Sequence, residues 1–463
     1  MALTVVVLAA GQGTRMKSTL PKVLHCLAGK PLLQHVLDTA NQLSPSKSIV
    51  VCGHQSKLLK DTFSNQPIEF IEQVPQRGTA DAVAKALPLL NENDKVLILS
   101  GDVPLICVDT LKRFVQSTPK NALGLITAQL ENPFGLGRIV RNNSGNITQV
   151  VEQKDANEDE QKICEINSGI YLVEANLLKK WIPQIQNKNQ QQEFYLTDII
   201  SIAVKEGVLV VSSAPENVHE ISGINDRAQL AQAERYYQHK QAQALMVQGV
   251  TIADPLRMDV RGELQCENDV SIDINVIFEG NVTLKKGCKI GPHCVVINST
   301  LGENVTLLAN CYIEGVNIAD NVTVGPFARL RPGTDIDSDA RIGNFVEVKN
   351  AKIGKGSKVN HLSYIGDATI GQGVNIGAGT ITCNYDGANK HQTVIEDDVM
   401  IGSDTQLIAP VRVGKGATIG AGSTINQNVP ENQLTLTHQL NQRSKNWERP
   451  KKSSFTNNHQ DKV

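Results

Sequence analysis

Short apolar runs alternate with amphipathic stretches through the first half of the chain. The runs at residues 5–10 and 96–100 are almost continuous in aliphatic residues, which is typical of strands buried on both faces of a parallel sheet. The strands expected are residues 5–10, 48–51, 96–100 and 123–130, and the helices expected are residues 32–42, 79–90 and 108–116. This alternation predicts an α/β, Rossmann-like domain over residues 1–227, in which ligands bind at the carboxyl ends of the strands.

A stretch of different character follows at residues 228–248. It contains no Gly or Pro and is rich in Ala and Gln, a composition that favours one long helix. The residues that fall on one face at helical spacing are Leu230, Ala233, Tyr237, Ala244 and Val247. We interpret this helix as a rigid linker between two domains.

From residue 252 onward, aliphatic residues recur at every sixth position. The series comprises Ile318, Val324, Leu330, Ile336, Ile342, Val348, Ile353, Val359, Ile365, Ile370, Ile376, Ile395, Ile401, Leu407, Val413, Ile419 and Ile425, with one-residue resets after Val348 and Ile365 and an insertion after Ile376. A six-residue period fits a triangular coil of about 18 residues, in which each side is one strand with its aliphatic residue inside and coils stack roughly 4.8 Å apart. The pattern predicts about nine coils over residues 249–444, and it resembles the left-handed parallel β-helix of hexapeptide-repeat acyltransferases.

Two segments depart from this period. Residues 382–393 are too long to fit in a coil, so we expect them to loop out, and loops that interrupt a repeat commonly carry binding residues. Residues 445–463 are polar, and we expect a mobile tail there.

The overall composition restricts the partners and the compartment. With 45 basic and 47 acidic residues the formal net charge is −2, which gives no electrostatic reason to expect binding to nucleic acid or to a membrane surface. The nine cysteines include no CxxC pair, a pattern that suits a reducing cytosol better than a disulfide scaffold. Residues 3–10 lack a preceding basic segment, which indicates a buried strand rather than a signal peptide, and no apolar run approaches the roughly 18 residues that span a membrane. We therefore expect a cytoplasmic protein.

A turn with two glycines follows the first expected strand. Residues 8–16 have the sequence LAAGQGTRM, and Pro21-Lys22 follows. Glycines allow backbone N–H groups to approach a phosphate chain closely. Met16 stands where a dinucleotide fingerprint and a P-loop each need a glycine, so neither motif is present.

Ser100-Gly101-Asp102 lies at the end of the strand expected at residues 96–100. A carboxylate at a strand end, next to a glycine, is well placed to hold Mg²⁺ on phosphate oxygens. We therefore expect Asp102 to be a metal ligand.

The pattern LxxGxGTxM followed by Pro21-Lys22 resembles the signature of sugar-phosphate nucleotidyltransferases. The first domain as a whole resembles the uridylyltransferase half of the bacterial bifunctional N-acetylglucosamine-1-phosphate uridylyltransferase family. The resemblance implies that Arg15 and Lys22 are catalytic and that the substrates are bound by Leu8, Ala9, Ala10, Gly11, Lys22, Gln73, Gly78, Thr79, Ser100, Gly101, Asp102, Gly137, Glu152, Asn167 and Asn225.

Within that set the resemblance implies a division of roles. Gln73, Gly78 and Thr79 would bind uracil, and Asn225 would join Asp102 on Mg²⁺. The residues that would hold the sugar are Gly137, Glu152 and Asn167. Arg77 and Asp81 stand where the family has Leu and His, on either side of Gly78-Thr79.

His361 is the candidate base of the second domain. The zinc site of β-helical carbonic anhydrases needs two histidines close together in the sequence, and His293, His361, His391 and His438 do not have that spacing. Acyl transfer to an amine needs a group that accepts a proton at cytosolic pH, which a histidine can do.

Cations recur about one coil apart near His361. Arg331 and Lys349 are 18 residues apart, and Tyr364 follows 15 residues later. We expect Arg331, Lys349 and residues 361–364 to form one basic ladder, without a sequence-adjacent carboxylate, that binds a phosphate-bearing substrate.

Residues 375–387, with the sequence NIGAGTITCNYDG, closely resemble the glucosamine-1-phosphate acetyltransferase half of the same bifunctional family. The resemblance implies that His361 is the general base and that Arg331, Lys349, Tyr364 and Asn375 bind the sugar phosphate. It implies that acetyl-CoA is bound by Ala378, Asn384, Tyr385, Ser403, Ala421 and His438, the last of which stands where the family has an Arg.

The two resemblances together imply a bifunctional enzyme. It would acetylate glucosamine 1-phosphate with acetyl-CoA and then, with Mg²⁺, join the product to UMP from UTP, releasing pyrophosphate and UDP-N-acetylglucosamine. Hexapeptide acyltransferases pack three prisms together, so a homotrimer is expected by analogy. The alternative is a nucleotidyltransferase with a single activity, whose β-helix serves only for oligomerisation or regulation.

Overall fold

The structure is a computed structural model that describes residues 2–53 and 55–437. The chain divides into two compact units, Met1–Asp320 (unit 1) and Asn321–Val463 (unit 2). The tail expected at residues 445–463 lies outside the described residues. In the described part of the chain, no helix is long and apolar enough to cross a membrane.

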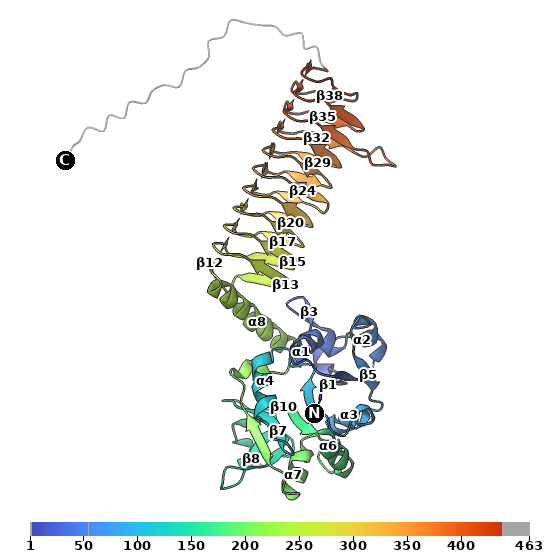
Figure 1. The fold of residues 1–463 in the computed structure, drawn as a ribbon, viewed down its shortest axis with the longest axis vertical. Helices are drawn as coiled ribbons and strands as arrows, with labels where there is room; N and C mark the ends of the chain where they lie inside the picture. Colours follow the sequence, from blue (N-terminus) through green and yellow to red (C-terminus); the bar gives the residue numbers. More distant parts are fainter. Residues whose placement is uncertain (1, 54, 438–463) are drawn as a thin grey trace, which may run out of the picture. The chain divides into compact units, whose positions relative to one another are not determined.

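A mixed sheet forms the centre of the first part of unit 1 (Figure 1). Its strand order is β11-β7-β10-β6-β1-β4-β5; in addition, β8 pairs with β10 and β9 pairs with β8. Strand β1 is parallel to β4 and β6, whereas β10 is antiparallel to β6 and β7. The strands are β1 (Leu3–Ala9), β4 (Lys47–Cys52), β5 (Glu69–Glu72), β6 (Lys95–Ser100), β7 (Leu123–Gln129), β8 (Arg138–Arg141), β9 (Ile147–Val151), β10 (Glu165–Glu174) and β11 (Val210–Ser213), beside a small hairpin of β2 (Cys26–Leu27) and β3 (Lys30–Pro31). The predicted α/β fold is confirmed, with one antiparallel strand inserted beside β6.

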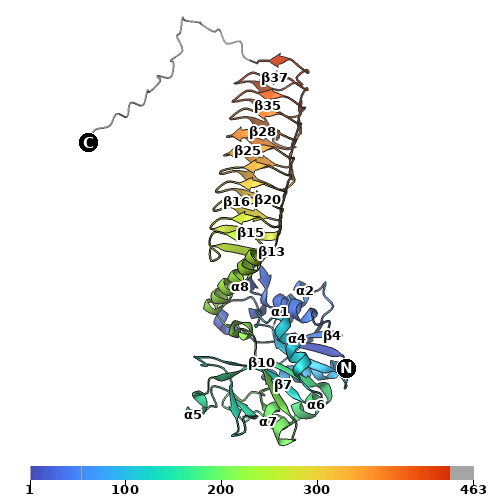
Figure 2. The ribbon, with the colours of Figure 1, turned by 60° about the vertical axis from the view of Figure 1, so that its left-hand side comes forward.

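Helices cover both faces of this sheet (Figure 2). One buried cluster joins the sheet to α3, α6 and α7, and a second joins its other face to α1, α2 and α4. The helices are α1 (Leu32–Asn41), α2 (Ser56–Thr62), α3 (Thr79–Ala86), α4 (Val108–Ser117), α5 (Glu158–Gln161), α6 (Ala175–Trp181), α7 (Asp198–Lys205) and α8 (Arg227–Val247). Burial on both faces explains why the central strands are continuous in apolar residues rather than alternating.

Helix α3 is shorter than the helix predicted at residues 79–90. The α-helical part ends at Ala86 and continues as a 3-10 turn over Leu87–Leu89. Pro88 has no backbone N–H and its ring clashes with the carbonyl four residues earlier, so an α-helix cannot run through this position.

Helix α8 is present as predicted, but the five residues named for one face are not all packed. Ala233 is buried, whereas Ala244 and Val247 are exposed, Val247 by 88%. Ala242 and Leu245 are the residues buried instead. The buried Gln238 side chain also belongs to the packed face, where it both donates to Val260 O and accepts from Val260 N, at 2.8 Å each. Apolar spacing alone does not reveal such a polar contact.

Short parallel strands form coils after α8, and each unit contains its own set. On the first face of the coils, unit 1 has β12 (Thr251–Ile252), β14 (Ser271–Ile272), β16 (Lys289–Ile290) and β19 (Thr306–Leu307). The other faces in unit 1 carry β13 (Met258–Cys266), β15 (Val276–Leu284), β17 (Val295–Ile297), β18 (Thr300–Leu301), β20 (Tyr312–Glu314) and β21 (Val316–Ile318).

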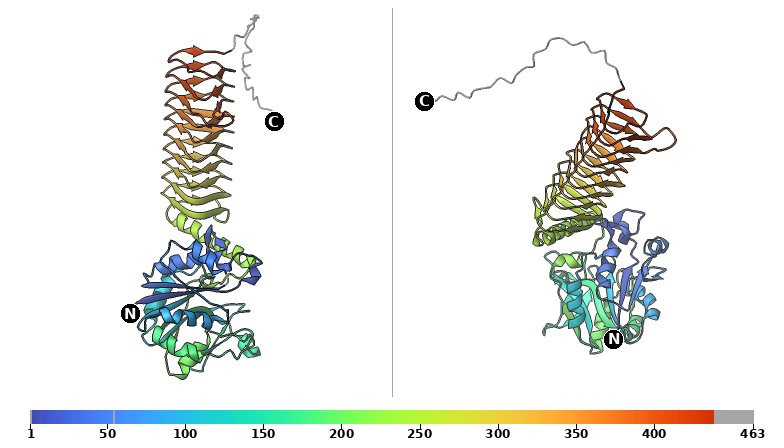
Figure 3. Two further views of the ribbon diagram at one scale, coloured as in Figure 1. Left: turned by 90° about the vertical axis from the view of Figure 1, so that its right-hand side faces the viewer. Right: turned by 45° about the horizontal axis from the view of Figure 1, so that its top comes forward.

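The coils of unit 2 have three rows of strands, which Figure 3 shows stacked one above another. The first row is β22 (Thr323–Val324), β25 (Arg341–Asn344), β28 (Lys358–His361), β31 (Asn375–Ile376), β34 (Met400–Ile401), β37 (Thr418–Ile419) and β39 (Leu434–Thr435). The second row is β23 (Arg329–Leu330), β26 (Glu347–Lys349), β29 (Tyr364–Gly366), β32 (Ile381–Cys383), β35 (Gln406–Ile408) and β38 (Thr424–Ile425). The third row is β24 (Thr334–Ile336), β27 (Lys352–Ile353), β30 (Ala368–Ile370), β33 (Thr393–Ile395) and β36 (Val411–Val413). The first face thus has four described strands in unit 1 and seven in unit 2, more than the nine coils expected.

The predicted six-residue period of inward-facing aliphatic residues is confirmed. All of the predicted aliphatic positions from Ile318 to Ile425 are buried, none of them more than 3% exposed. Along the first row the paired residues are Val324, Ile342, Val359, Ile376, Ile401 and Ile419. The left-handed β-helix predicted for this region is confirmed as a fold class.

The insertion projects from the coils as expected (Figures 1 and 3). Strand β32 ends at Cys383 and β33 begins at Thr393, and Tyr385 pairs with Lys390 across the loop in an isolated antiparallel bridge. The segment is therefore a small hairpin rather than an irregular loop.

The alternation of inward and outward residues can be tested on two neighbours in β25. Ile342 is fully buried, whereas Arg341 is exposed. Ile342→Ala should lower the free energy of unfolding by about 2–5 kcal/mol, because it removes buried methyl groups and leaves a cavity. Arg341→Ala should change it by no more than about 0.5 kcal/mol. Urea unfolding followed by hydrogen exchange of the coil amides would measure both, and equal effects would contradict the assigned register.

Candidate functional site

A cavity of about 530 Å³ lies where β1 and β6 end in unit 1. Twelve of the residues predicted for the nucleotide site line it: Leu8, Ala9, Ala10, Gly11, Arg15, Lys22, Gln73, Gly78, Thr79, Ser100, Asp102 and Asn225. Gly101 does not line the cavity but places its neighbours, because its N–H donates to Leu8 O at 2.9 Å. The structure therefore brings together residues from four separate segments of the sequence.

Backbone pairing brings Asp102 and Asn225 to one point. Asp102 follows β6, and its carbonyl accepts from Ile224 N at 2.9 Å. Asn225 is the next residue, so its side chain lies beside the Asp102 carboxylate.

Lys22, at the start of a 3-10 turn, reaches the same point. Its ammonium forms an ion pair with Asp102 and donates to Asn225 Oδ1 at 3.0 Å. Only 12% of the Lys22 side chain and 16% of the Asp102 side chain are exposed. By contrast, Arg15 is exposed and has no ion-pair partner in the described part of the chain. The site thus holds one paired and one free cation.

The oxygens around the Lys22 ammonium fit a metal cation. One carboxylate and one amide oxygen converge on a position that already holds a positive charge. Mg²⁺ typically takes one or two protein oxygens and completes its shell with phosphate oxygens and water. Asp102 and Asn225 are therefore suited to hold Mg²⁺ together with a bound triphosphate.

Gly78 and Thr79 join the cavity to the start of α3. Gly78 has φ 114°, and a side chain there would meet Phe194 O at 2.5 Å, so only glycine fits. Its carbonyl accepts from Gln73 Nε2 at 2.8 Å, and Thr79 Oγ1 accepts from Leu196 N at 2.9 Å. Gln73 itself is 3% exposed.

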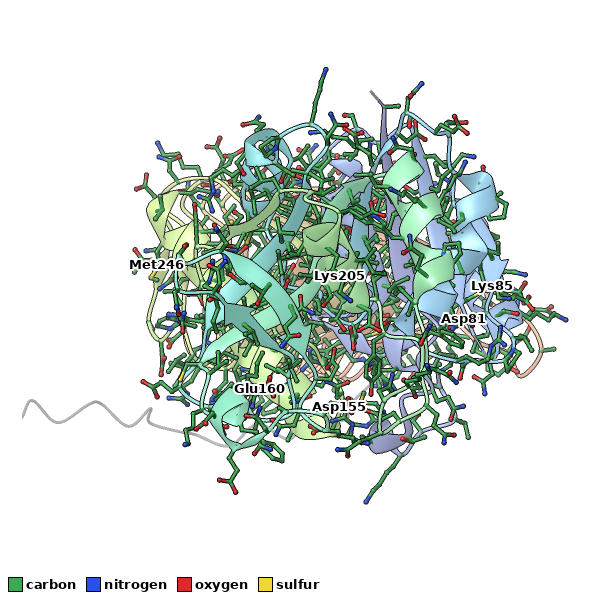
Figure 4. All side chains as sticks on the ribbon, turned by 90° about the horizontal axis from the view of Figure 1, so that it is seen from below. Asp81, Lys85, Asp155, Glu160, Lys205 and Met246 are labelled. Carbon is green, nitrogen blue, oxygen red and sulfur yellow. The ribbon has the colours of Figure 1, made fainter. Side chains whose placement is uncertain are left out.

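The three predicted sugar residues are neighbours: Gly137 directly precedes β8, Glu152 directly follows β9, and Asn167 lies in β10. Asn167 N donates to Gly137 O at 2.9 Å, and a side chain on Gly137 would lie 3.5 Å from the Glu152 carboxylate. They do not line the first cavity, but Glu152 lines a second one, of about 280 Å³, together with Asp155, Tyr195 and other residues. Figure 4 labels Asp155 in this region.

The Glu152 carboxyl is in an unfavourable environment for a charge. Burial is the main cause that raises its pKa above the ordinary value of 4.5, and the nearby Asp155 and Asp198 carboxylates raise it further. A hydrogen bond from Thr197 and the charge of Arg138 act in the opposite direction. A half-buried carboxylate kept in such a place is typical of a functional position.

Four cavity residues were missed by the sequence analysis. They are Val23, Gln76, Ala82 and Glu193. Gln76 donates to Ala10 O and so ties the 73–78 loop to the end of β1. No local motif marks it, because the contact joins residues 66 positions apart.

In unit 2, His361 lies at the end of β28 and is exposed. Its Nδ1 is 2.8 Å from Oδ1 of Asn344, the residue paired with it in β25. A carbonyl oxygen can only accept, so Nδ1 carries the proton and Nε2 keeps its lone pair. This is the tautomer that a general base needs, and Asn344 was not predicted.

The expected basic ladder is only partly correct. Lys349 pairs in register with Gly366, which is 17 positions later, and Tyr364 pairs with Glu347. The 15 positions from Lys349 to Tyr364 are therefore less than one coil. Glu347 also provides a carboxylate where none was expected, and it forms an ion pair with Arg331 at 2.9 Å. His361 belongs to a different row of strands from Lys349 and Tyr364.

Lys349 has a second cation beside it. The Lys349 ammonium lowers the pKa of Lys390, which projects from the hairpin, while Asp367 acts in the opposite direction. Asp367 also accepts hydrogen bonds from Asn384 and from Asn350. Two ammonium groups held this close favour an anionic ligand.

Three of the predicted acetyl-CoA residues form a column along unit 2. Asp404 N donates to Ala378 O at 2.7 Å, and Gly422 N donates to Ser403 O at 2.8 Å, so Ala378, Ser403 and Ala421 occupy equivalent corners of successive coils. Asn384 is buried, and Tyr385 is 61% exposed on the hairpin. Asn375 lies in β31 and donates to Met400 Sδ at 3.6 Å. His438 lies outside the described residues.

Comparison with known protein families finds two kinds of domain in the chain. A family model described as a MobA-like NTP transferase domain matches residues 5–149. Models described as bacterial transferase hexapeptide repeats and as the hexapeptide repeat of succinyl-transferase match residues 392–427 and 299–325.

Full-length relatives combine both parts. Proteins named "Bifunctional protein GlmU" are 51% identical over 451 residues in Marinobacter nauticus, 52% over 450 residues in Herminiimonas arsenicoxydans and 53% over 457 residues in Legionella pneumophila. The alignments cover 97–98% of this chain and 99% of each relative.

The raised pKa of Glu152 has a consequence for stability. Because the folded state holds this proton more tightly than the unfolded chain, the stability of unit 1 falls as the pH rises above about 4.5 through the folded pKa. Glu152→Gln removes this effect, so the variant should melt at a higher temperature than the native protein near neutral pH, and the gap should close below pH 4.5. Thermal melts between pH 4 and 8 would measure it.

The exposed Glu131 offers a control, since Glu131→Gln should leave the melting temperature nearly unchanged. A lower melting temperature of Glu152→Gln at neutral pH would show instead that the ionised carboxylate is stabilised by its neighbours.

Proposed function

The chain belongs to the family of bifunctional GlmU proteins, and on that basis we propose that its two sites catalyse successive steps in the synthesis of UDP-N-acetylglucosamine. Unit 2 would acetylate glucosamine 1-phosphate with acetyl-CoA, and the cavity of unit 1 would then transfer UMP from UTP to the product. The observation that supports this proposal most is that twelve of the residues predicted for the nucleotide site line one cavity around the Lys22–Asp102–Asn225 contacts. On the coils, His361 makes a side-chain contact with Asn344.

In the acetyl transfer, His361 acts as the general base. The amine of the sugar attacks the thioester carbonyl, the C–S bond breaks, and the amine proton passes to His361 Nε2 and then to the leaving thiolate. Asn344 holds the ring in the required tautomer. The acetyl group would arrive along the corner column formed by Ala378, Ser403 and Ala421.

The remaining residues of this site bind the two substrates. Arg331, Lys349, Tyr364 and Asn375 would hold the sugar phosphate. Lys390 would add its charge to that of Lys349, because the two ammonium groups are neighbours. Asn384, Tyr385 and His438 would contact acetyl-CoA.

In the uridylyl transfer, a phosphate oxygen of N-acetylglucosamine 1-phosphate attacks the α-phosphorus of UTP, and pyrophosphate leaves. Arg15 and Lys22 would stabilise the charge that gathers on the phosphoryl oxygens. The backbone of residues 8–11 would cradle the phosphates, Gln73, Gly78 and Thr79 would bind the base, and Gly137, Glu152 and Asn167 would orient the sugar. Ser100 and Gly101 place Asp102 at the end of β6.

A bound Mg²⁺ would neutralise part of the triphosphate charge. Asp102 and Asn225 would hold it, since their oxygens already surround one positive charge.

We also propose how the chain is organised in the cell. Residues 1–227 would be the nucleotidyltransferase domain, 228–248 the linker helix, 249–444 the acetyltransferase domain and 445–463 a tail. A homotrimer would form through the flat walls of the β-helix. The nine free cysteines are compatible with a reducing, cytoplasmic location.

A β-helix that only assembles the enzyme is less well supported. That alternative gives no reason for a histidine with a fixed tautomer or for two neighbouring ammonium groups. The bifunctional relatives in the comparison also match nearly the whole chain.

His361→Ala should lower the rate of acetyl transfer by about 10²–10⁴-fold, because the variant lacks the base that takes the amine proton. Uridylyl transfer should stay within about twofold of the native rate, since the base belongs to the other site. Release of coenzyme A thiol and of pyrophosphate would be measured separately on the same preparation. His293→Ala, at another exposed position of the coils, is the matched control and should affect neither rate. Near-normal acetyl transfer by His361→Ala would show that another group is the base.

Asp102→Ala should have the opposite effect. Uridylyl transfer should fall by at least about 10²-fold, because a carboxylate that binds cations at the phosphates is lost, while acetyl transfer should remain normal. Pyrophosphate release would be followed as Mg²⁺ is titrated, and Asp102→Asn should require more Mg²⁺ than the native enzyme. Unchanged Mg²⁺ dependence in both variants would argue against Asp102 as a metal ligand.

A further inference from the structure

The side-chain amide of Gln73 is held by two partners deep in the nucleotide cavity. Its Nε2 lies 2.8 Å from Gly78 O and 2.9 Å from Asp81 Oδ2. The backbone is fixed as well, since Gln73 N donates to Cys52 O at 2.8 Å. Gln73 and Asp81 are only 3% and 8% exposed, so water does not compete for these contacts.

These partners determine which way the amide points. A backbone carbonyl and an ionised carboxylate can only accept hydrogen bonds, so both must face the NH₂ group. The two hydrogens of Nε2 are then used, and Oε1 is the polar atom of Gln73 that remains for a ligand. The side chain therefore offers the cavity an acceptor and no donor.

Asp81 is in turn held by Arg77. The guanidinium of Arg77 donates to Asp81 Oδ1 at 3.1 Å and lies over the ring of Phe194, 5.8 Å from its centroid. The pair is one helical turn apart, with Asp81 in the first turn of α3. Arg77 and Asp81 are the two positions at which this chain departs from the Leu and His of its family, and the structure joins them in a single contact.

We infer that Asp81, held by Arg77, is a positioning residue that fixes the Gln73 amide with its oxygen toward the nucleotide and thereby sets the preference for uracil over cytosine. Uracil has an N–H at ring position 3, which matches an acceptor. Cytosine has a lone pair there, which would face Oε1 and leave a buried acceptor unpaired. This inference rests on the proposed uridylyl transfer at the same cavity.

A purely structural role for Asp81 predicts a different result. An aspartate in the first turn of a helix is stabilised by the helix dipole, so its loss would weaken the start of α3 and the binding of every nucleotide alike. The ratio of kcat/KM for UTP to that for CTP separates the two roles, because only a change in the orientation of the amide alters it.

The experiment compares Asp81→Leu with the native full-length enzyme. Pyrophosphate release would be measured with N-acetylglucosamine 1-phosphate, Mg²⁺ and either UTP or CTP. We expect the UTP/CTP ratio to fall by at least about tenfold, because the amide then keeps only Gly78 O as a partner and can turn its NH₂ group to the base. Lys85→Ala is the matched control: Lys85 lies one turn further along α3, as the labels in Figure 4 show, and its loss should leave the ratio unchanged.

A second variant keeps the test decisive if Asp81→Leu folds poorly. The double substitution Arg77→Leu, Asp81→His restores the family's pair and an acceptor nitrogen beside Gln73, so it should retain the native ratio, whereas Arg77→Leu, Asp81→Leu should not. A ratio that stays within twofold in every folded variant without an acceptor at position 81 would overturn the inference. If the native enzyme used neither nucleotide, the proposed function would fail instead, and the two failures are therefore distinguishable.

Discussion

Parallel pairing of strands is the constraint on which the rest of this structure depends. In a parallel sheet the carboxyl ends of neighbouring strands meet at the same edge, so residues that follow β1 and β6 lie close together although they are about 90 positions apart in the sequence. In the coils, the same kind of pairing stacks equivalent corners. His361 therefore lies beside Asn344, and Ala378 lies in line with Ser403.

In both sites, parallel pairing of strands brings positive charges close to one another or close to a single carboxylate. Lys22 occupies the point where Asp102 and Asn225 converge, and Lys349 lies beside Lys390. Such arrangements are favourable once an anion is present, because phosphate oxygens can share the cations. The second cavity shows the reverse case: Glu152 is half-buried near other carboxylates, and these surroundings raise its pKa, as is common where a carboxyl group serves binding or catalysis.

The spacing of residues along the chain predicted burial best where apolar packing alone decides which side chains lie inside. Every aliphatic residue of the six-residue series from Ile318 to Ile425 is buried, because the interior of a narrow coil admits only one kind of side chain at that position. The same spacing predicted the arrangement of side chains less well where polar residues also pair inside the fold. In α8, Ala244 and Val247 are exposed whereas the polar Gln238 is buried and paired with Val260. In the coils, Glu347 forms an ion pair with Arg331 within the expected ladder of cations.

The sequence by itself determined the two architectures and most of the candidate residues, since both the repeat and the glycine turn are local patterns with a direct physical meaning. Only the tertiary structure decided how these residues act on one another. That Asn344 sets the tautomer of His361, and that Arg77 and Asp81 together orient Gln73, follows from hydrogen bonds whose directions depend on the folded backbone. Hydrogen bonds are directional and short in range, so a sequence can name their donors and acceptors but cannot say which of them meet.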